Sequence, residues 1–257
     1  MSRTPSLQSA SVLVTFIVLI WRIEAADSLS ELTPPPEIAD AICRPEFQTA
    51  NDKFKAGTAF MAQAFLGSSW RPVLVTAHHL FGPNGGLPRQ IRWSELSSFV
   101  RSVRCTSFVS ERDVRSGPPL RVQDARPFSE EGFPRDVAVF ALPDGNDRAL
   151  QFSTGVPVSG QRVWLVARVA GGEPPTKLLH RASLVKADRA WIRFQYDNSK
   201  VDLRATSGAP VVDERGRVIG INLGGGRDGN KMVGVAQSAQ VILAALESAL
   251  SEPARPR

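Results

Sequence analysis

The sequence predicts an all-β fold, a barrel or a sandwich, with one helix at its C-terminal end. From Gly57 onward the apolar residues fall into short runs separated by turn-forming residues, a pattern typical of all-β domains. Residues 209–213 and 217–223 are two such runs joined by a turn through Gly216, which predicts a hairpin. The one long helical pattern begins near Ser238.

Each expected strand is a short apolar or alternating run bounded by turn residues. The expected strands are residues 58–66, 72–76, 136–142, 162–169, 182–185, 190–194, 209–213 and 217–223. The helix is expected to begin at a Ser238 cap and to stop before Pro253, with one apolar face. That face comprises Val241, Ile242, Ala245, Ala249 and Leu250.

Length and composition indicate a globular protein. With 257 residues, 42% of them hydrophobic, the chain can bury a substantial core as one large or two small domains. The formal net charge is +6, but Lys and Arg are scattered rather than clustered with aromatic residues. We therefore expect no nucleic-acid partner; the alternative is a basic module that binds nucleic acid or the cell envelope.

The first 25 residues are expected to be a signal peptide. Arg3 precedes an apolar run over residues 12–21, and the small residue Ala25 ends a plausible cleavage site. The run is shorter than the roughly 20 residues that a membrane-spanning helix needs. We therefore expect an exported protein, periplasmic or secreted, with no stable membrane insertion after cleavage. A retained N-terminal anchor is the alternative.

Two cysteines, Cys43 and Cys105, are present. An even number of cysteines in an oxidising compartment predicts a disulfide between them, and two unpaired buried thiols are the alternative. Neither cysteine has the spacing of a metal site, and the chain has only three histidines. We expect neither a metal nor a cofactor.

The segment most informative about function is residues 202–212, which place Ser207 on a turn of small residues before an apolar strand. A hydroxyl is a poor nucleophile until a base removes its proton and nearby N–H groups stabilise the resulting oxyanion. Two upstream segments offer partners: residues 74–82 contain adjacent histidines, and residues 135–140 begin an apolar strand with an aspartate. The chain order His, Asp, Ser is that of the chymotrypsin-type hydrolases.

Four short motifs resemble those of the trypsin-like (chymotrypsin-fold) serine peptidases, particularly their bacterial exported members. Residues 57–61, Gly-Thr-Ala-Phe-Met, resemble the family's Gly-Thr-Gly-Phe strand, and residues 75–79, Val-Thr-Ala-His-His, resemble its Thr-Ala-Ala-His motif. Residues 136–139, Asp-Val-Ala-Val, are similar to its Asp-Ile-Ala-Leu strand, and residues 206–212 are similar to its Asp-Ser-Gly-Gly-Pro segment. The resemblance extends over about residues 57–250.

The resemblance implies two six-stranded antiparallel β-barrels, with the active site in the cleft between them and a C-terminal α-helix packed outside. Residues 57–150 are then the first barrel, and residues 151–250 are the second barrel with the helix. Residues 26–56, which include the proline run 34–36, are expected to be an N-terminal extension or linker, and residues 251–257 a tail.

The resemblance also implies a catalytic triad of His79, Asp136 and Ser207, and an oxyanion hole formed by the N–H groups of Ala205 and Ser207. Family spacing selects the second of the two adjacent histidines, so His78 is expected to be a structural, partly buried residue. The implied function is that of an exported serine endopeptidase acting on a protein or peptide substrate.

Each of these residues has a structural alternative. Ser207 could be an ordinary turn serine, and Asp136 a turn aspartate that caps a strand. Asp136 alone begins an alternating apolar strand, where a buried acid needs a partner. Its competitors are Asp113, Asp124, Asp144 and Asp147. The third histidine, His180, lies in the segment 178–196 that carries two of the expected strands, and it is expected to be structural or exposed.

Two departures from the family motifs keep a second function open. Ala205 stands where the family usually has glycine, and alanine tolerates unusual backbone angles less well. Thr206 replaces an aspartate that pairs with a newly cut N-terminus in members activated by cleavage. The second function is a catalytically inactive trypsin-like domain that acts as a binding module.

By the family register, the floor of the substrate pocket should lie near Val201. Its walls should be Leu223, Gly224, Gly225, Gly226 and Gly234. Because Val201 supplies no carboxylate, we expect an apolar or small residue before the cleaved bond rather than Lys or Arg. A shift of one residue would place Asp202 in the pocket and reverse that preference. The three consecutive glycines lack the helix and the lysine of a phosphate-binding loop.

Overall fold

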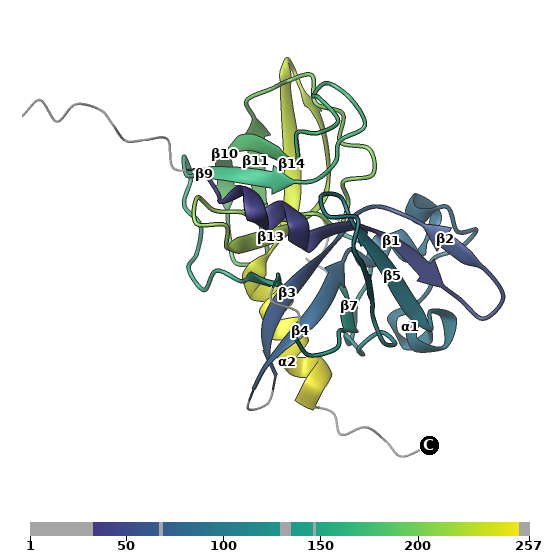
Figure 1. Cartoon of the computed structure of the whole chain (residues 1–257). Helices are drawn as coiled ribbons and strands as arrows, with labels where there is room; N and C mark the ends of the chain where they lie inside the picture. The colour runs from purple at the N-terminus through teal and green to yellow at the C-terminus, as the bar shows by residue number, and fades with distance from the viewer. Residues whose placement is uncertain (1–32, 67–68, 129–134, 146–147, 252–257) are drawn as a thin grey trace, which may run out of the picture. The chain divides into compact units, whose positions relative to one another are not determined.

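Short strands build two sheets in the computed structural model, which describes residues 33–66, 69–128, 135–145 and 148–251. Helix α2 (Ala239–Ser251) contacts β3 of one sheet and β13 and β14 of the other (Figure 1). The expected signal peptide and tail lie outside the described residues, apart from Ser251. Within these residues no helix has both the length and the apolar character needed to cross a membrane.

The N-terminal half is an eight-stranded sheet in the order β6-β5-β1-β3-β4-β7, with β2 paired to β1 and β8 paired to β3. All of its pairs are antiparallel except β3 with β8. Its strands are β1 (Ile42–Gln48), β2 (Lys53–Lys55), β3 (Ala59–Leu66), β4 (Ser69–Thr76), β5 (Ser102–Ser107), β6 (Asp113–Arg115), β7 (Ala138–Ala141) and β8 (Leu150–Gln151).

The two ends of this sheet meet through the segment that follows β6. The Gly117 N–H donates to the Ala141 carbonyl (2.9 Å), and the Leu120 N–H donates to the Val139 carbonyl (2.8 Å). Residues 118–119 are both proline and have no N–H to donate, and the contact stays an isolated antiparallel bridge between Pro119 and Phe140 rather than a longer ladder. The described residues therefore show an eight-stranded sheet here, and its closure into the first barrel that the resemblance implies stays a prediction.

The C-terminal half is a closed six-stranded barrel in the order β10-β11-β14-β13-β12-β9, which confirms the second expected barrel. Its strands are β9 (Arg162–Val166), β10 (Leu179–Ala187), β11 (Trp191–Tyr196), β12 (Pro210–Val212), β13 (Val218–Asp228) and β14 (Lys231–Ser238). Alternate residues of β11 are buried, because successive side chains of a strand point to opposite faces. The β13–β14 hairpin reaches beyond the other strands of the barrel (Figure 1).

The helices are short except for α2. They are the 3-10 helices η1 (Pro36–Ala41), η2 (His78–Phe81) and η3 (Pro83–Gly85), and the α-helix α1 (Trp93–Phe99). The buried face of α2 comprises Ala239, Ile242, Ala245 and Leu246, whereas Val241, expected on that face, is only half-buried. The Ser238 hydroxyl donates to the Arg189 carbonyl, which ties the start of α2 to the turn before β11.

The expectation that residues 26–56 form an extension is wrong for their C-terminal part. Strand β1 lies at the centre of the N-terminal sheet between β5 and β3, and Phe47 on this strand is fully buried. Pro45 and the nearby proline run kept β1 from being predicted, because proline within an apolar run usually argues against a central strand. The boundary expected at Gly57 therefore falls inside the sheet.

Several elements of the structure have no counterpart in the sequence-based prediction. These are β1, β2, β5, β6, β8, β14 and α1. In addition, residues 224–226, expected as a loop, continue β13 and pair with β14. Strand β14 does not alternate, and Gly234 and polar residues interrupt its apolar residues, so its pairing with β11 and β13 rather than a local pattern defines it.

Two hydrophobic cores follow from these sheets. The N-terminal core is built around Phe47, whose ring centroid lies 4.8 Å from that of Phe81 and 6.2 Å from that of Phe140. A disulfide between Cys43 on β1 and Cys105 on β5 joins two neighbouring strands of this sheet. The barrel has its own core, which includes Leu165, Ile192, Phe194, Val211 and Ile219.

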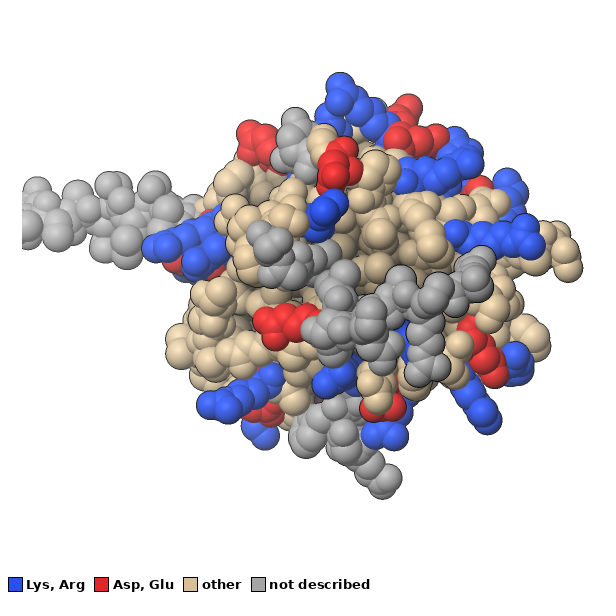
Figure 2. All heavy atoms as spheres, turned by 90° about the horizontal axis from the view of Figure 1, so that it is seen from below, with Lys and Arg blue, Asp and Glu red and all other residues tan. Residues whose placement is uncertain are grey.

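Charged side chains cover the exterior without forming a single stripe. Figure 2 shows Lys and Arg distributed over one face of the molecule, with Asp and Glu among them. Several of these charges form ion pairs, for example Arg104 with Asp113 and Arg193 with Asp228. Exposed pairs of this kind each add little to stability.

Phe47→Ala should lower the free energy of unfolding by about 3–5 kcal/mol, because it empties the centre of a well-packed aromatic core. Phe65→Ala is the matched control: Phe65 is 52% exposed and packs mainly on Trp70, so its loss should cost about 1 kcal/mol. Denaturant unfolding of both variants measures the difference. Equal losses would contradict the assignment of Phe47 to the core.

Candidate active site

The pairing of β4 with β7 brings His79 and Asp136 together. Thr76 at the end of β4 lies opposite Ala138 at the start of β7, so the residues just beyond each strand end are neighbours. His79 Nδ1 lies 2.8 Å from Asp136 Oδ2, and the His79 backbone N–H donates to Asp136 Oδ1 at 2.8 Å. Both side chains are buried.

The buried carboxylate of Asp136 has further partners. The Phe128 N–H donates to its Oδ2 at 2.8 Å. The backbone N–H of Asp136 itself donates to Oε1 of Gln237, a buried residue on β14 of the barrel. A buried charge needs such compensation, since an unpaired one is costly. These hydrogen bonds hold Asp136 at a point where the two halves of the molecule meet.

Ser207 lies on the turn before β12. The next residue, Gly208, packs against the backbone that leads into His79. A Cβ atom on Gly208, which has a φ of +87°, would collide with the Thr58 carbonyl and the Thr76 hydroxyl. The turn therefore packs directly on the backbone that leads into His79, and glycine is required there. The Ser207 hydroxyl donates to the Leu223 carbonyl at 3.2 Å, and the described residues show no hydrogen bond from Ser207 to His79.

The Ser207 turn leaves two N–H groups free. Those of Arg204, Thr206, Gly208 and Ala209 all donate to protein oxygens. Among the described residues no acceptor is present for the N–H groups of Ala205 and Ser207, the two expected to form an oxyanion hole. Ala205 has a φ of +65°, in the left-handed region that costs alanine about 1 kcal/mol or more.

Two side chains that the sequence analysis did not identify hold this turn. The buried Thr58 donates from Oγ1 to the Ala205 carbonyl at 2.9 Å. The buried Asn222 donates from Nδ2 to the carbonyl and the hydroxyl of Thr206, at 3.1 and 3.0 Å. Thr58 lies within the recognised Gly-Thr motif, and Asn222 is a polar residue inside the apolar run of β13, so both carried a signal.

Comparison with known proteins identifies the family of this chain. A model of the trypsin-like peptidase domain matches residues 57–221, more than half of the chain. The chain belongs to the trypsin-like peptidase family. This membership confirms the family expected from the sequence and makes the chain a serine-type endopeptidase, a hydrolase. No curated protein sequence matches the peptidase significantly.

Solved structures share its fold at low sequence identity. The active form of the Rv3671c protease from M. tuberculosis is 15% identical with a TM-score of 0.51, over 83% of this chain and 86% of that one. The thermostable serine protease AL20 from an extremophilic microorganism is 14% identical with a TM-score of 0.54, over 85% and 100%. The serine endoprotease from Yersinia pestis is 12% identical with a TM-score of 0.55, over 83% and 64%.

The other two histidines of the peptidase are buried. Both ring nitrogens of His78 lack a hydrogen-bond partner among the described residues. Burial lowers the pKa of His78, outweighing the opposing effects of Asp136 and the nearby Ile91 backbone, and so favours the neutral ring. His180 Nε2 lies 3.0 Å from the Ala167 carbonyl, and burial lowers its pKa too.

The competing aspartates lie elsewhere. Asp113 pairs with Arg104, the exposed Asp144 pairs with Arg71, and Asp124 is exposed. Asp147 lies outside the described residues.

A cavity of about 510 Å³ opens beside the Ser207 turn, between residues 200–204 and β13. Val201, Gly224, Gly225 and Gly226 line it, as expected for the substrate pocket, and Asp202 lines it as well. Leu223 and Gly234 do not line it. Leu223 instead accepts the Ser207 hydrogen bond, and Gly234 lies beneath the Phe194 ring, where a Cβ atom would collide.

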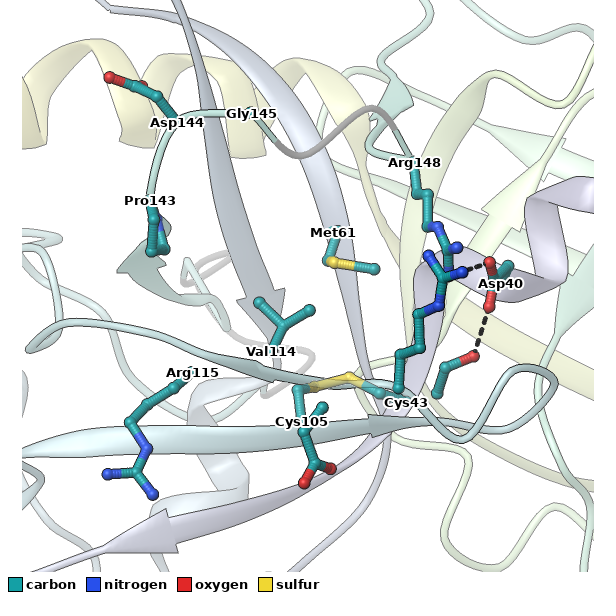
Figure 3. A pocket seen from close by; sticks show the side chains of 13 residues that line it. Asp40, Cys43, Met61, Cys105, Val114, Arg115, Pro143, Asp144, Gly145 and Arg148 are labelled. Atoms are coloured by element: carbon teal, nitrogen blue, oxygen red, sulfur yellow. Dashed lines mark hydrogen bonds and ion pairs between the residues drawn. A yellow bond between two sulfur atoms is a disulfide. The ribbon is translucent and has the colours of Figure 1, made fainter.

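A second cavity, of about 360 Å³, lies beside the disulfide and away from these residues (Figure 3). Arg148 points across it to Asp40, which also accepts hydrogen bonds from two serine hydroxyls. Burial raises the pKa of Asp40, but the hydrogen bonds from Ser110 and Ser107 and the charge of Arg148 outweigh it and lower the pKa overall. The lining arginines and aspartates balance, and we interpret this cavity as a structural ion-pair site.

Metal binding has no obvious location: in the described part of the chain, no three His, Cys, Asp or Glu side chains are grouped to hold an ion.

Ala205→Gly should leave the free energy of unfolding unchanged or raise it by up to about 1 kcal/mol, because glycine adopts a φ of +65° without a steric penalty. Ala244→Gly is the control, since Ala244 is exposed within α2, where the same change should cost about 1 kcal/mol. Chemical denaturation compares the two. A loss at Ala205 as large as that at Ala244 would contradict the left-handed geometry.

Proposed function

We propose that the chain is an exported serine endopeptidase that hydrolyses peptide bonds with a triad of Ser207, His79 and Asp136. The observation that supports this best is the buried 2.8 Å contact of Asp136 with His79 Nδ1, beside a turn that packs on the backbone leading into His79. The proposal includes the fold: the N-terminal sheet is the first barrel, closed through residues 117–120.

The carboxylate of Asp136 sets the tautomer of the base. A proton on Nδ1 donates to Asp136, which leaves the lone pair on Nε2 of His79 free to accept a proton. Asp136 also stabilises the imidazolium that forms when His79 takes the Ser207 proton. The buried carboxylate is held from several sides, so the ring of His79 is oriented before substrate arrives.

Catalysis requires a small movement of Ser207. Its hydroxyl donates to the Leu223 carbonyl in the resting structure, and rotation about χ1 would redirect it to His79 Nε2. The Ser207 oxygen then attacks the substrate carbonyl carbon while its proton passes to His79. The N–H groups of Ala205 and Ser207 stabilise the tetrahedral oxyanion, and His79 protonates the leaving amine. In the second half, His79 takes a proton from water as the water oxygen attacks the acyl carbonyl carbon, and it returns that proton to the Ser207 oxygen as the ester bond breaks and the carboxylic acid leaves.

In this proposal, hydrogen bonds from Thr58 and Asn222 order the Ser207 turn, which in activated relatives is ordered by cleavage of the chain. Thr206 stands where activated relatives have an aspartate, and here its hydroxyl accepts from Asn222 and donates to the Leu203 carbonyl at 2.6 Å. Thr58 fixes the Ala205 carbonyl. The turn is therefore preorganised by neutral hydrogen bonds within the chain.

Export is supported by the apolar segment at residues 12–21 and by the Cys43–Cys105 disulfide, which persists in oxidising compartments. The substrate is a protein or peptide that places a side chain in the cavity floored by Val201. The second candidate function, an inactive binding module, is favoured by one observation: Ser207 is bonded to Leu223 and not to His79.

Ser207→Ala should abolish labelling by a fluorophosphonate and hydrolysis of peptides, because it removes the nucleophile, while the folded structure is retained. Gel detection of the label and circular dichroism measure the two properties. A folded wild-type protein that takes up no label would favour the binding module over the enzyme.

His79→Ala should lower the turnover number at least about a hundredfold, since it removes the general base. His78→Ala should lower it far less, because His78 has no hydrogen bond to the proposed triad. Steady-state rates are measured at a temperature where both variants are folded, as judged by thermal unfolding. The reverse ranking would show that the two adjacent histidines have been assigned the wrong way round.

A further inference from the structure

The cavity beside the Ser207 turn has an apolar lining and a cationic edge. Val201 is buried at one side, and the half-buried Leu203 and Met232 supply further apolar surface. Three exposed cations also line the cavity: Lys200, Arg204 and Arg227.

The one acidic residue that lines the cavity is already neutralised. Both oxygens of Asp202 accept from the Arg204 guanidinium, at 2.9–3.0 Å from Nε, and Oδ1 also accepts from the Arg204 backbone N–H. These bonds lower the pKa of Asp202 and raise that of Arg204, so the pair stays charged and matched. A one-residue error in the family register would therefore still leave no free acid for a basic substrate.

Lys200 and Arg227 remain without an acidic partner among the described residues. The acids on the neighbouring strands are already paired: Asp228 with Arg193, Asp197 with Arg181, and Glu173 with Lys177. The cavity thus carries an uncompensated charge of two cations next to apolar walls.

We propose that this pocket selects an acidic side chain, glutamate or aspartate, immediately before the cleaved bond, in place of the apolar or small residue expected from Val201 alone. The proposal rests on the proposed function, since it assigns the cavity to the substrate. The methylene groups of the acidic residue pack on Val201 and Leu203, while its carboxylate turns to the cations at the edge. A Lys or Arg side chain would meet two uncompensated positive charges and be rejected.

Lys200 and Arg227 are exposed to solvent, and this exposure limits the selectivity that they can give for an acidic residue. Exposed ion pairs are weak and are screened by salt, so selectivity arises from two modest contributions rather than one strong contact. We expect each cation to contribute about twofold to threefold in selectivity and the two together about fivefold.

The test compares peptides that differ only at the residue before the cleaved bond: Glu, its uncharged isostere Gln, and Lys. The full-length protein should show kcat/KM about fivefold higher for the Glu peptide than for the Gln peptide at low salt, with the Lys peptide lowest. Raising the salt to about 0.5 M should bring the Glu/Gln ratio close to one.

Variants identify the residues responsible. Arg227→Gln and Lys200→Gln should each lower the Glu/Gln ratio about twofold to threefold. Arg44→Gln, on an exposed position of β1, is the matched control and should leave the ratio unchanged. Asp202→Asn should raise the Glu/Gln ratio, because it frees Arg204. If Asp202 instead recognised basic residues, wild type would prefer the Lys peptide and Asp202→Asn would abolish that preference.

Binding separates failure of the inference from failure of the proposed function. The Ser207→Ala protein cannot cleave, so the dissociation constants of the three labelled peptides report the pocket alone. Tighter binding of Glu than Gln supports the pocket assignment even if wild type hydrolyses nothing and takes up no label. Equal binding of Glu and Gln, or tighter binding of Lys, would overturn it whether or not the enzyme is active.

Discussion

The buried carboxylate of Asp136 is the interaction on which the rest of this structure depends. Its oxygens accept hydrogen bonds from the backbone and ring of His79 and from the Phe128 N–H. The backbone N–H of Asp136 donates to the Gln237 side chain at the end of the barrel. Removing either His79 or the Phe128 N–H would leave the buried carboxylate with fewer hydrogen bonds in surroundings that solvate a charge poorly. The two halves of the molecule are thus joined at the point where the proposed base is oriented, and folding completes the site.

The turn that carries Ser207 is held by neutral hydrogen bonds rather than by a buried charge. Its conformation needs a left-handed residue at position 205, and alanine adopts it at a cost that glycine would avoid. Thr58 and Asn222 offset that cost by donating to the carbonyls of Ala205 and of the next residue, Thr206. A residue poorly suited to its own backbone is thus held by one contact from just before β3 and one from β13.

Local motifs pointed to the residues of the proposed site, because the turn around Ser207 and the strand ends near His79 and Asp136 each have a short sequence pattern; the structure brings His79 and Asp136 together, and the role of Ser207 stays a prediction. The supporting residues were not predicted. Thr58 bonds to a residue 147 positions away and Asp136 to one 101 positions away, and no local pattern encodes such a pairing. Strand β1 was missed for a similar reason, since its place between β5 and β3 outweighs the prolines around it. The short apolar runs predicted an all-β fold, and the family resemblance implied the closed barrel that the C-terminal half forms, whereas closure of the N-terminal sheet into a barrel stays a prediction.

The disulfide between β1 and β5 also determines how the fold responds to a broken chain. The connection from β1 to β2 is residues 49–52, of which residues 50–52 are exposed and would be accessible to cleavage by another protease. After such a cut, β1 would stay in the sheet, because Cys43 remains covalently bound to Cys105 and the pairing of β1 with β5 spans the whole strand below it. A nicked molecule would therefore keep its central strand and the aromatic core around Phe47. The disulfide thus limits the structural effect of a single backbone cut in this connection.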